Sequence, residues 1–214
     1  MYVLAEQHRW LRDIATHTLR DPVGFWQKME SLPLVKGTIS KNAQAALDHL
    51  MPEPGLAYSL RRRVSGVGCL GHPRFVALAE WHGGKIAREA KALVPSACVW
   101  TRDGHGIHTI MYQSLLDQAV RCRDPFVQLQ GRWLVRRLAP YCSRIELTAL
   151  PRKRDEGQLL YAMGWETANV HLGSHTAIKA IQRDHATRKA TWLREAAMRM
   201  TSVTISDWKE WARR

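Results

Sequence analysis

The amino-acid sequence predicts an α+β protein with N-terminal helices, a small antiparallel sheet and then a C-terminal helical part. Three observations favour this class. Helix-capping signals dominate the first third of the chain, short apolar segments separated by glycines fill the middle, and basic segments with helical spacing form the end. Strand and helix signals do not alternate, which argues against a parallel α/β sheet.

Composition limits the classes of protein to which the chain can belong. Its 214 residues are 45% hydrophobic, which is enough for one core. No apolar run reaches the roughly 18 residues that span a bilayer, and the charged N-terminus lacks the apolar part of a signal peptide. We therefore expect a soluble, cytoplasmic protein with no membrane contact. The net charge of +13 favours polyanionic partners such as nucleotides, nucleic acids or an acidic protein chain.

Segment 1–55 is expected to be helical. We predict a first helix over residues 3–20. Asp21 followed by Pro22 is an N-cap with proline at the first helical position, which starts a second, short helix. Ser40 caps a third helix, which ends before a stretch rich in proline and glycine. That stretch is the best internal boundary in the chain.

Segment 56–150 is expected to form an antiparallel sheet with one helix. "LAYSLRRRVSGVG" and "PRFVALAEW" predict two strands that flank a glycine loop. Gly83 and Gly84 predict a tight hairpin into a third strand, "KIAREA", because both can adopt positive φ without steric cost. A helix over 108–122 and a further hairpin over 126–140, turning near its glycine, complete the segment.

Segment 151–214 is expected to be helical and to pack with the rest as one compact unit. Asp155 caps its first helix, for which the spacing predicts an apolar face and an opposite polar face. The apolar face would carry Leu159, Leu160, Met163, Thr167 and Val170, and the polar face Gln158, Glu166 and Asn169. Trp208 and Trp211 are expected to anchor the last helix by packing.

The glycine loop has the spacing G-x-G-x-x-G at Gly66, Gly68 and Gly71. It runs into a strand-like segment, whereas a dinucleotide-binding loop runs into a helix whose N-terminus holds the pyrophosphate. A glycine loop between two strands covers the ATP phosphates in protein kinases, which also place a basic residue on the third strand. Arg88 would be that residue. A tight turn in which the glycines only permit the backbone conformation remains the alternative.

Four motifs in this order resemble a large family of uncharacterised bacterial proteins: "RRVSGVGCLGHPRFVALAEW", "REAKALVPSA", "GRWLVRRLAP" and "YAMGWETANVHLG". The resemblance covers the chain from about Leu4 onward. The family shares features with the protein-kinase-like and aminoglycoside-phosphotransferase-like fold. The resemblance therefore implies a sheet like a kinase N-lobe, with ATP as a ligand and a phosphate-covering loop. Cys69 stands where many members have serine, and Arg88 where many have lysine.

The chain departs from this family in one important way. Full-length members carry D-x-H-x-x-N-F-G-like and D-F-D-E-like motifs, which by analogy with kinases would hold metal and perform catalysis. Neither occurs here, and "QRDHATRK" has Lys189 where a metal-binding asparagine would stand. We therefore expect the C-terminal half of a longer architecture, without catalytic or metal-binding residues. A complementary N-terminal half or partner chain would supply the magnesium site, so whether the chain is an enzyme stays open.

The first functional hypothesis is an uncharacterised kinase-like protein that acts as a nucleotide- or phosphate-binding module. Its expected cofactor-binding residues are Gly66, Gly68, Cys69, Gly71 and Arg88. The alternative is a basic module that binds nucleic acid or a partner chain without enzymatic activity, suggested by the charge and the tryptophan- and arginine-rich end. A third hypothesis is a structural half that folds only against a partner.

Overall fold

The computed structural model describes residues 21–66, 71–96, 99, 109–140 and 156–213. The chain divides into two compact units, 1–173 and 174–214. The boundary between them falls inside the segment 151–214, which the sequence analysis treats as one helical segment. The helix predicted over 3–20 and the N-cap expected at Asp155 lie outside the described residues.

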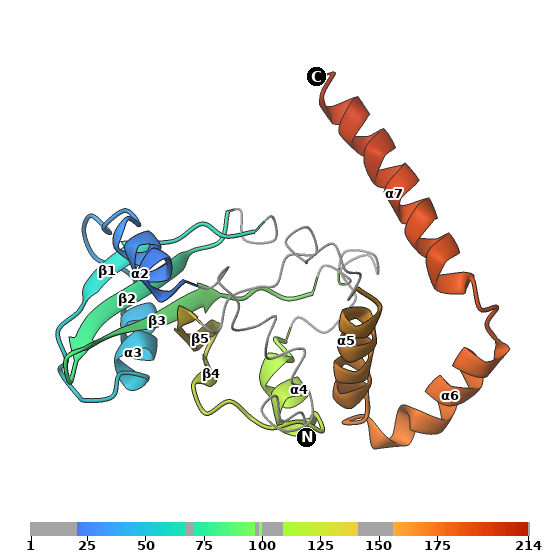
Figure 1. Ribbon diagram of the computed structural model, residues 1–214, viewed down its shortest axis with the longest axis horizontal. Helices are drawn as coiled ribbons and strands as arrows, with labels where there is room; N and C mark the ends of the chain where they lie inside the picture. The colour runs from blue at the N-terminus through green and yellow to red at the C-terminus, as the bar shows by residue number, and fades with distance from the viewer. Residues whose placement is uncertain (1–20, 67–70, 97–98, 100–108, 141–155, 214) are drawn as a thin grey trace. The chain divides into compact units, whose positions relative to one another are not determined.

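A five-stranded antiparallel sheet forms the centre of the first unit, as Figure 1 shows. Its strands are β1 (Ser59–Arg62), β2 (Arg74–Trp81), β3 (Gly84–Ala92), β4 (Val127–Gln130) and β5 (Trp133–Leu138). Their order in the sheet is β1-β2-β3-β5-β4, and all neighbouring pairs are antiparallel. With helices before and after the sheet, the predicted α+β class is confirmed.

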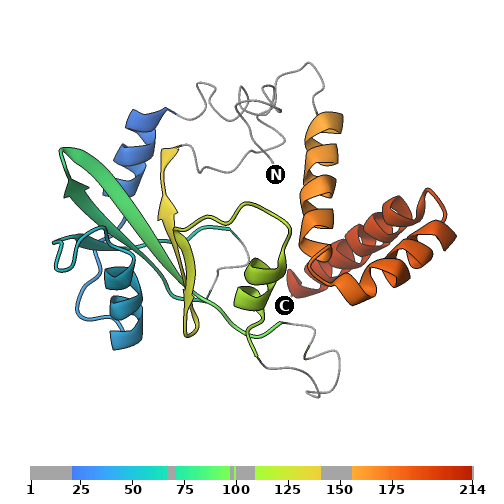
Figure 2. The same cartoon turned by 90° about the horizontal axis from the view of Figure 1, so that it is seen from below.

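Successive side chains of a strand point to opposite faces of the sheet, so the sheet has apolar residues on both faces. A helix packs on each face. Helix α3 (Lys41–His49) packs Leu47 into a core with Ala90 and Trp133. Helix α2 (Pro22–Glu30) packs Met29 on the other face, in a core that includes Val76. Figures 1 and 2 show the two helices on opposite sides of β2 and β3. The chain before the sheet thus supplies the cover for both of its faces.

The two predicted helix caps near the N-terminus are confirmed. The Asp21 carboxylate accepts hydrogen bonds from the backbone N–H groups of Val23 and Gly24, both at 2.9 Å, and Pro22 follows at the first helical position. The Ser40 hydroxyl accepts from the Ala43 N–H at 3.3 Å. These bonds satisfy amides that have no partner inside the helix, which fixes where α2 and α3 begin.

The turn between β2 and β3 differs by one residue from the prediction. Trp81 pairs with Gly84, so the turn consists of His82 and Gly83, with φ of 46° and 75°. Positive φ at both central residues is the geometry that matches the twist of a two-residue hairpin. The predicted pair Gly83 and Gly84 was wrong in register because Gly84 already belongs to β3. The β4–β5 hairpin does turn at Gly131, which has φ of 59°.

The helix expected over 108–122 is shorter in the structure. Helix α4 spans Tyr112–Gln118, and Ala119 after it is extended. No side chain caps its first turn. The end of α4 and the residues after it pack against the C-terminal end of helix α5 (Glu156–His171). Gly173, just after α5, allows the Gln118 carbonyl to approach, because a Cβ at Gly173 would lie 2.6 Å from that oxygen.

The apolar face predicted for α5 was wrong. Leu159 and Ala162 are the buried residues of this helix, whereas Leu160 and Met163 are exposed. The supposedly polar side meets the segment after α4. There Arg121 Nη2 lies 3.0 Å from Glu166 Oε1, and the Val120 N–H donates to the Asn169 carbonyl at 3.0 Å. The contact surface of α5 is therefore partly polar, which a periodicity of apolar residues cannot reveal.

The second unit consists of helices joined by short non-helical segments. It contains the short 3₁₀ helix η6 (His175–Ala177), α6 (Ile178–Thr187) and α7 (Trp192–Trp211). Neither α6 nor α7 contains a buried residue. Trp208 and Trp211 are exposed, so the structure lacks the packing that was expected of them. None of the described helices combines the length and the apolar character needed to cross a membrane.

The β2–β3 turn gives a direct test of the register. Gly83→Ala places a side chain at φ of 75° and should destabilise the protein by about 1 kcal/mol. Gly84→Ala is the matched control, because its Cβ would meet the Trp81 carbonyl oxygen at an ordinary 3.6 Å. Urea denaturation measures both free energies of unfolding. A larger loss at Gly84 than at Gly83 would contradict this register.

Candidate functional site

The glycine loop joins β1 to β2, so the predicted strand–loop–strand context is confirmed. Gly66 and Gly71 have φ of 74° and 80°, in the left-handed region that favours glycine. Gly68 and Cys69 lie outside the described residues. Positive φ at both ends suits a phosphate-covering loop and a plain turn equally, so nucleotide binding by these residues stays a prediction.

Strand β3 carries two charged residues that point to opposite faces of the sheet. Arg88 pairs across the strands with Ala77 and Arg137. Glu89, next to it, therefore lies on the face of α2, while Arg88 lies on the face of α3. The two residues have different surroundings, and each forms the centre of its own group of contacts.

Arg88 is almost completely buried, with 8% of its surface exposed. Its Nε donates to the Leu50 carbonyl at 3.0 Å, and its Nη1 donates to the Ala87 carbonyl at 3.1 Å. The guanidinium carbon lies 5.1 Å from the centre of the Phe126 ring. Among the described residues, no carboxylate forms an ion pair with Arg88. Within the described parts of the chain, carbonyl groups and an aromatic ring are thus the groups that solvate its positive charge.

A second guanidinium group lies close to the first. Arg137 approaches the same Phe126 ring, with 4.9 Å from its guanidinium carbon to the ring centre. Burial lowers the pKa of Arg88 below its usual range, and the positive charge of Arg137 lowers it further. Arg137 itself is exposed and pairs with Asp124 at 3.6 Å. An anion near Arg88 would oppose this lowering of its pKa, because it would favour the charged form.

On the other face, Glu89 is fully buried and is surrounded by three arginines. Its Oε2 accepts a hydrogen bond from Arg63 Nη1 and lies 3.5 Å from Arg74 Nη1. Its Oε1 accepts from Arg136 Nη2 at 2.9 Å and Nε at 3.0 Å. We refer to Glu89, Arg63, Arg74 and Arg136 as the Glu89 cluster.

The Glu89 cluster holds both ends of the glycine loop. Arg63 precedes the loop and Arg74 follows it, and the Arg63 N–H donates to the Arg74 carbonyl at 3.1 Å. Both side chains meet the same oxygen of Glu89. One buried carboxylate on β3 therefore fixes where the loop leaves β1 and where it enters β2. The sequence analysis did not identify these residues as a group, because their proximity depends on strand pairing.

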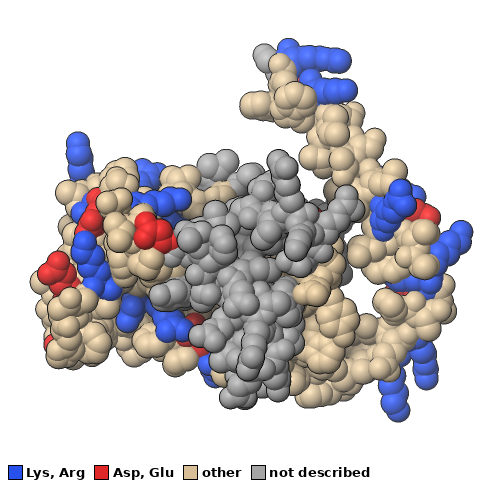
Figure 3. Space-filling model, viewed as in Figure 1, with Lys and Arg blue, Asp and Glu red and all other residues tan. Residues whose placement is uncertain are grey.

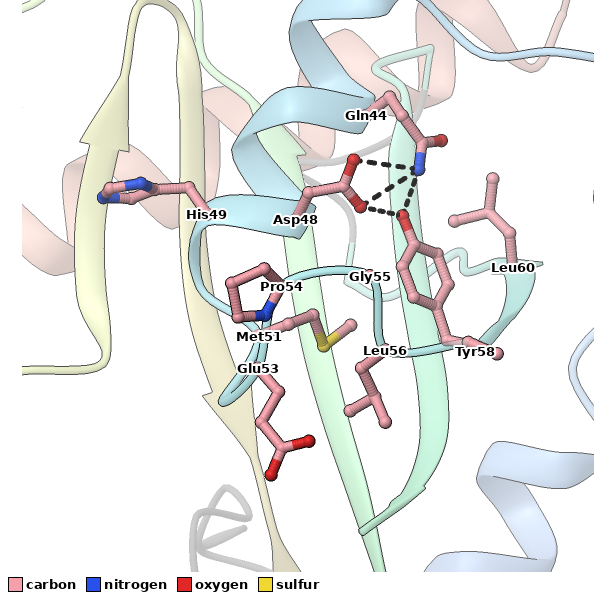
Figure 4. Close-up of a pocket in the computed structure, with 11 residues that line it drawn as sticks. Gln44, Asp48, His49, Met51, Glu53, Pro54, Gly55, Leu56, Tyr58 and Leu60 are labelled. Atoms are coloured by element: carbon pink, nitrogen blue, oxygen red, sulfur yellow. Dashed lines mark hydrogen bonds between the residues drawn. The ribbon is translucent and has the colours of Figure 1, made fainter.

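A separate pocket of about 760 Å³ lies beside α3 and contains none of the predicted site residues. Figure 4 shows the hydrogen-bonded side chains that line it. The Tyr58 hydroxyl donates to Asp48 Oδ1 at 2.7 Å and also contacts the Gln44 amide. Burial raises the pKa of Tyr58, and the hydrogen bond to Asp48 raises it further. With Asp48 and Glu53 in its lining, this pocket does not favour a phosphate group.

The described parts of the chain contain no group of three or more His, Cys, Asp or Glu residues placed to hold a metal ion. Asp184, in the sequence "QRDHATRK", lies on exposed helix α6. The hydrogen bond from Arg188 lowers its pKa, and the two side chains form a surface ion pair at 2.6 Å. This arrangement is the solvated helix face typical of such a charged stretch. Cys122 is a free, exposed thiol.

The buried charge of Glu89 should be essential for stability. Glu89→Gln leaves the three arginines without their carboxylate and should lower the free energy of unfolding by about 3–5 kcal/mol. Glu80→Gln, an exposed change on the neighbouring strand β2, should stay within about 0.5 kcal/mol of the parent. Chemical denaturation measures the free energy of unfolding of both variants. Equal losses would contradict the claim that the ion pairs of Glu89 stabilise the fold.

Comparison with known proteins identifies the relatives of this chain. The model of the DUF2252 family, described as an uncharacterized protein conserved in bacteria, matches residues 56–214. The matched region contains the whole sheet, while α2 and α3 lie before it. No curated protein and no solved structure matches the chain. Because the match covers well over half of the sequence, the chain belongs to the DUF2252 family.

Proposed function

We propose that the chain is a kinase-like module that binds the phosphate groups of a nucleotide, with ATP as the first candidate. The observation that supports this function best is the buried guanidinium group of Arg88, which has no carboxylate partner among the described residues. Buried charges in proteins are normally paired, because an isolated charge in a low-dielectric interior is costly. A phosphate group on the α3 face would supply the missing negative charge.

The surroundings of Arg88 suit a polyphosphate chain. Arg137 brings a second positive charge to the Phe126 ring, and each guanidinium group can bind a phosphate through two parallel hydrogen bonds. Arg88 now donates to the Leu50 carbonyl, at the C-terminal end of α3. This hydrogen bond holds the Arg88 guanidinium group on the α3 face, where a phosphate would meet it.

The glycine loop would cover the phosphate groups. No atom lies within 4 Å of the position that a Cβ would occupy at Gly66 or Gly71, so packing does not require glycine there. Without side chains at these positions, a phosphate could approach the backbone, whose N–H groups are effective donors to phosphate oxygens. A loop of this kind between two strands, together with a basic residue on the third strand, is the arrangement that protein kinases use.

The proposal is binding without phosphoryl transfer by this chain alone. Transfer needs metal ions that bridge the phosphates, and these ions need carboxylate or amide ligands. The aspartate motifs that would supply such ligands are absent from the sequence. If the family is active, the magnesium ligands would have to come from a different polypeptide segment, and this chain would contribute the phosphate-binding half of the site.

Ligand-induced stabilisation tests the proposal. Mg-ATP at 100 times its dissociation constant should stabilise the chain by about 2.7 kcal/mol in a thermal unfolding titration. Arg88→Met should abolish this stabilisation while leaving the chain folded, because an apolar side chain of similar length can remain buried. Arg183→Gln on exposed helix α6 removes the same charge elsewhere and should leave ATP binding unchanged.

Tripolyphosphate and a short DNA duplex, at low and moderate salt, separate this function from general attraction to polyanions. Figure 3 shows Lys and Arg side chains over the sheet and over the C-terminal helices, so some electrostatic binding is expected. Such binding weakens steeply as salt rises, because it depends on counterion release. If all three polyanions stabilise the protein equally and lose their effect with salt, the nucleotide site is refuted and the basic module becomes the better account.

A further inference from the structure

Among the described residues, the formal charges of the Glu89 cluster do not balance. Three guanidinium groups meet one carboxylate, which leaves a formal charge of 3 − 1 = +2. Glu89 is 0% exposed and Arg74 is 6% exposed, so this charge lies in an environment of low dielectric constant. There, unbalanced positive charge is much more costly than at a solvated surface.

Further positive charge lies on the same face of the sheet. Arg61 pairs across the strands with Val76, in the same row as Glu89, and Lys91 pairs with Arg74. Paired residues share a face, so both side chains belong to the face of the cluster. The nearby carboxylates have other partners, because Glu30 pairs with Lys85 and Asp124 with Arg137. No second carboxylate joins the cluster among the described ion pairs.

Two arginines of the Glu89 cluster, Arg63 and Arg136, have further hydrogen-bond donors. The Arg136 side chain is 44% exposed and that of Arg63 is 19% exposed, so both guanidinium groups reach the solvent. Arg136 uses Nε and Nη2 for Glu89, and Arg63 uses Nη1. The remaining N–H groups of Arg63 and Arg136 make no hydrogen bond to any described residue. Glu89 thus orients two partly exposed guanidinium groups that keep donors without a described partner.

From this arrangement we infer that the Glu89 cluster is a binding site for an oxyanion of the phosphate class, on the α2 face of the sheet. Guanidinium groups are the side chains best suited to a tetrahedral oxyanion, because they donate two parallel hydrogen bonds. Helix α2 packs over Leu78 and Ala87, which lie further along the strands from the glycine loop. The site lies at the loop end, where Arg63 and Arg74 are neighbours.

This site is distinct from the proposed nucleotide site. Arg88 and the cluster lie on opposite faces of β3, so the two sites have no arginine in common. The inference therefore does not depend on nucleotide binding. A phosphate bound to the cluster would balance the surplus charge and would also tie Arg63, at the start of the glycine loop, more firmly to the sheet.

Calorimetric titration of the full chain with inorganic phosphate tests the site, with sodium chloride at the same ionic strength as the reference. We expect saturable binding of phosphate. Arg136→Gln should weaken it about tenfold, as for the loss of one charged hydrogen bond. Arg62→Gln is the matched control, because Arg62 is an exposed residue of β1 that points to the other face. It should change the phosphate affinity by less than about twofold.

A second background decides the remaining outcomes. The titration is repeated with Arg88→Met chains, which lack the proposed nucleotide site; phosphate should still bind saturably, and Arg136→Gln should still weaken that binding about tenfold. If binding is lost in this background while Arg136→Gln alone has no effect, the anion site is at Arg88 and this inference fails while the nucleotide site gains support. No saturable binding, or equal weakening by Arg62→Gln and Arg136→Gln, would overturn the inference.

Discussion

The rest of the structure depends on the ion pairs of one fully buried carboxylate, Glu89. Its three arginine partners come from the end of β1, from β2 and from β5, so a single side chain of β3 connects four strands of the sheet. Such a group is costly to bury, and loss of the carboxylate would leave three guanidinium groups without their shared counter-charge. The same ion pairs fix both ends of the glycine loop, so the stability of the sheet and the geometry of the candidate site are physically linked.

Successive side chains of β3 point to opposite faces of the sheet, which separates the positive charge of Arg88 from the negative charge of Glu89. Glu89 gathers arginines on the face of α2, while Arg88 is buried on the face of α3 against carbonyl oxygens and Phe126. Helices α2 and α3 cover these faces although they precede the region that matches the DUF2252 family. In this chain, the sheet of the matched region is therefore completed by helices from outside that region, and the Leu50 carbonyl that follows α3 accepts a hydrogen bond from Arg88.

Local signals allowed most elements to be predicted from the sequence, because caps and turns depend on neighbouring residues. Asp21 and Ser40 begin helices as expected, and the strands around the glycine loop form as expected. The errors concern contacts between distant segments. The polar packing of α5 against the residues after α4 could not be predicted from periodicity, since Glu166 and Asn169 meet partners that no spacing rule identifies. The Glu89 cluster was missed for the same reason: only the strand register brings Arg63, Arg74 and Arg136 together.

The most direct test of the central claim is a double-mutant cycle between Glu89 and Arg63, measured as free energies of unfolding for Glu89→Gln, Arg63→Gln and the combined variant. If the buried carboxylate organises the sheet and the loop, the two losses should be strongly non-additive, with a coupling energy of about 1–3 kcal/mol. The cycle between Glu89 and exposed Arg62, on the opposite face, should show coupling close to zero. Additive losses for Glu89 and Arg63 would contradict the account, because the ion pair would then contribute nothing to the stability of the fold.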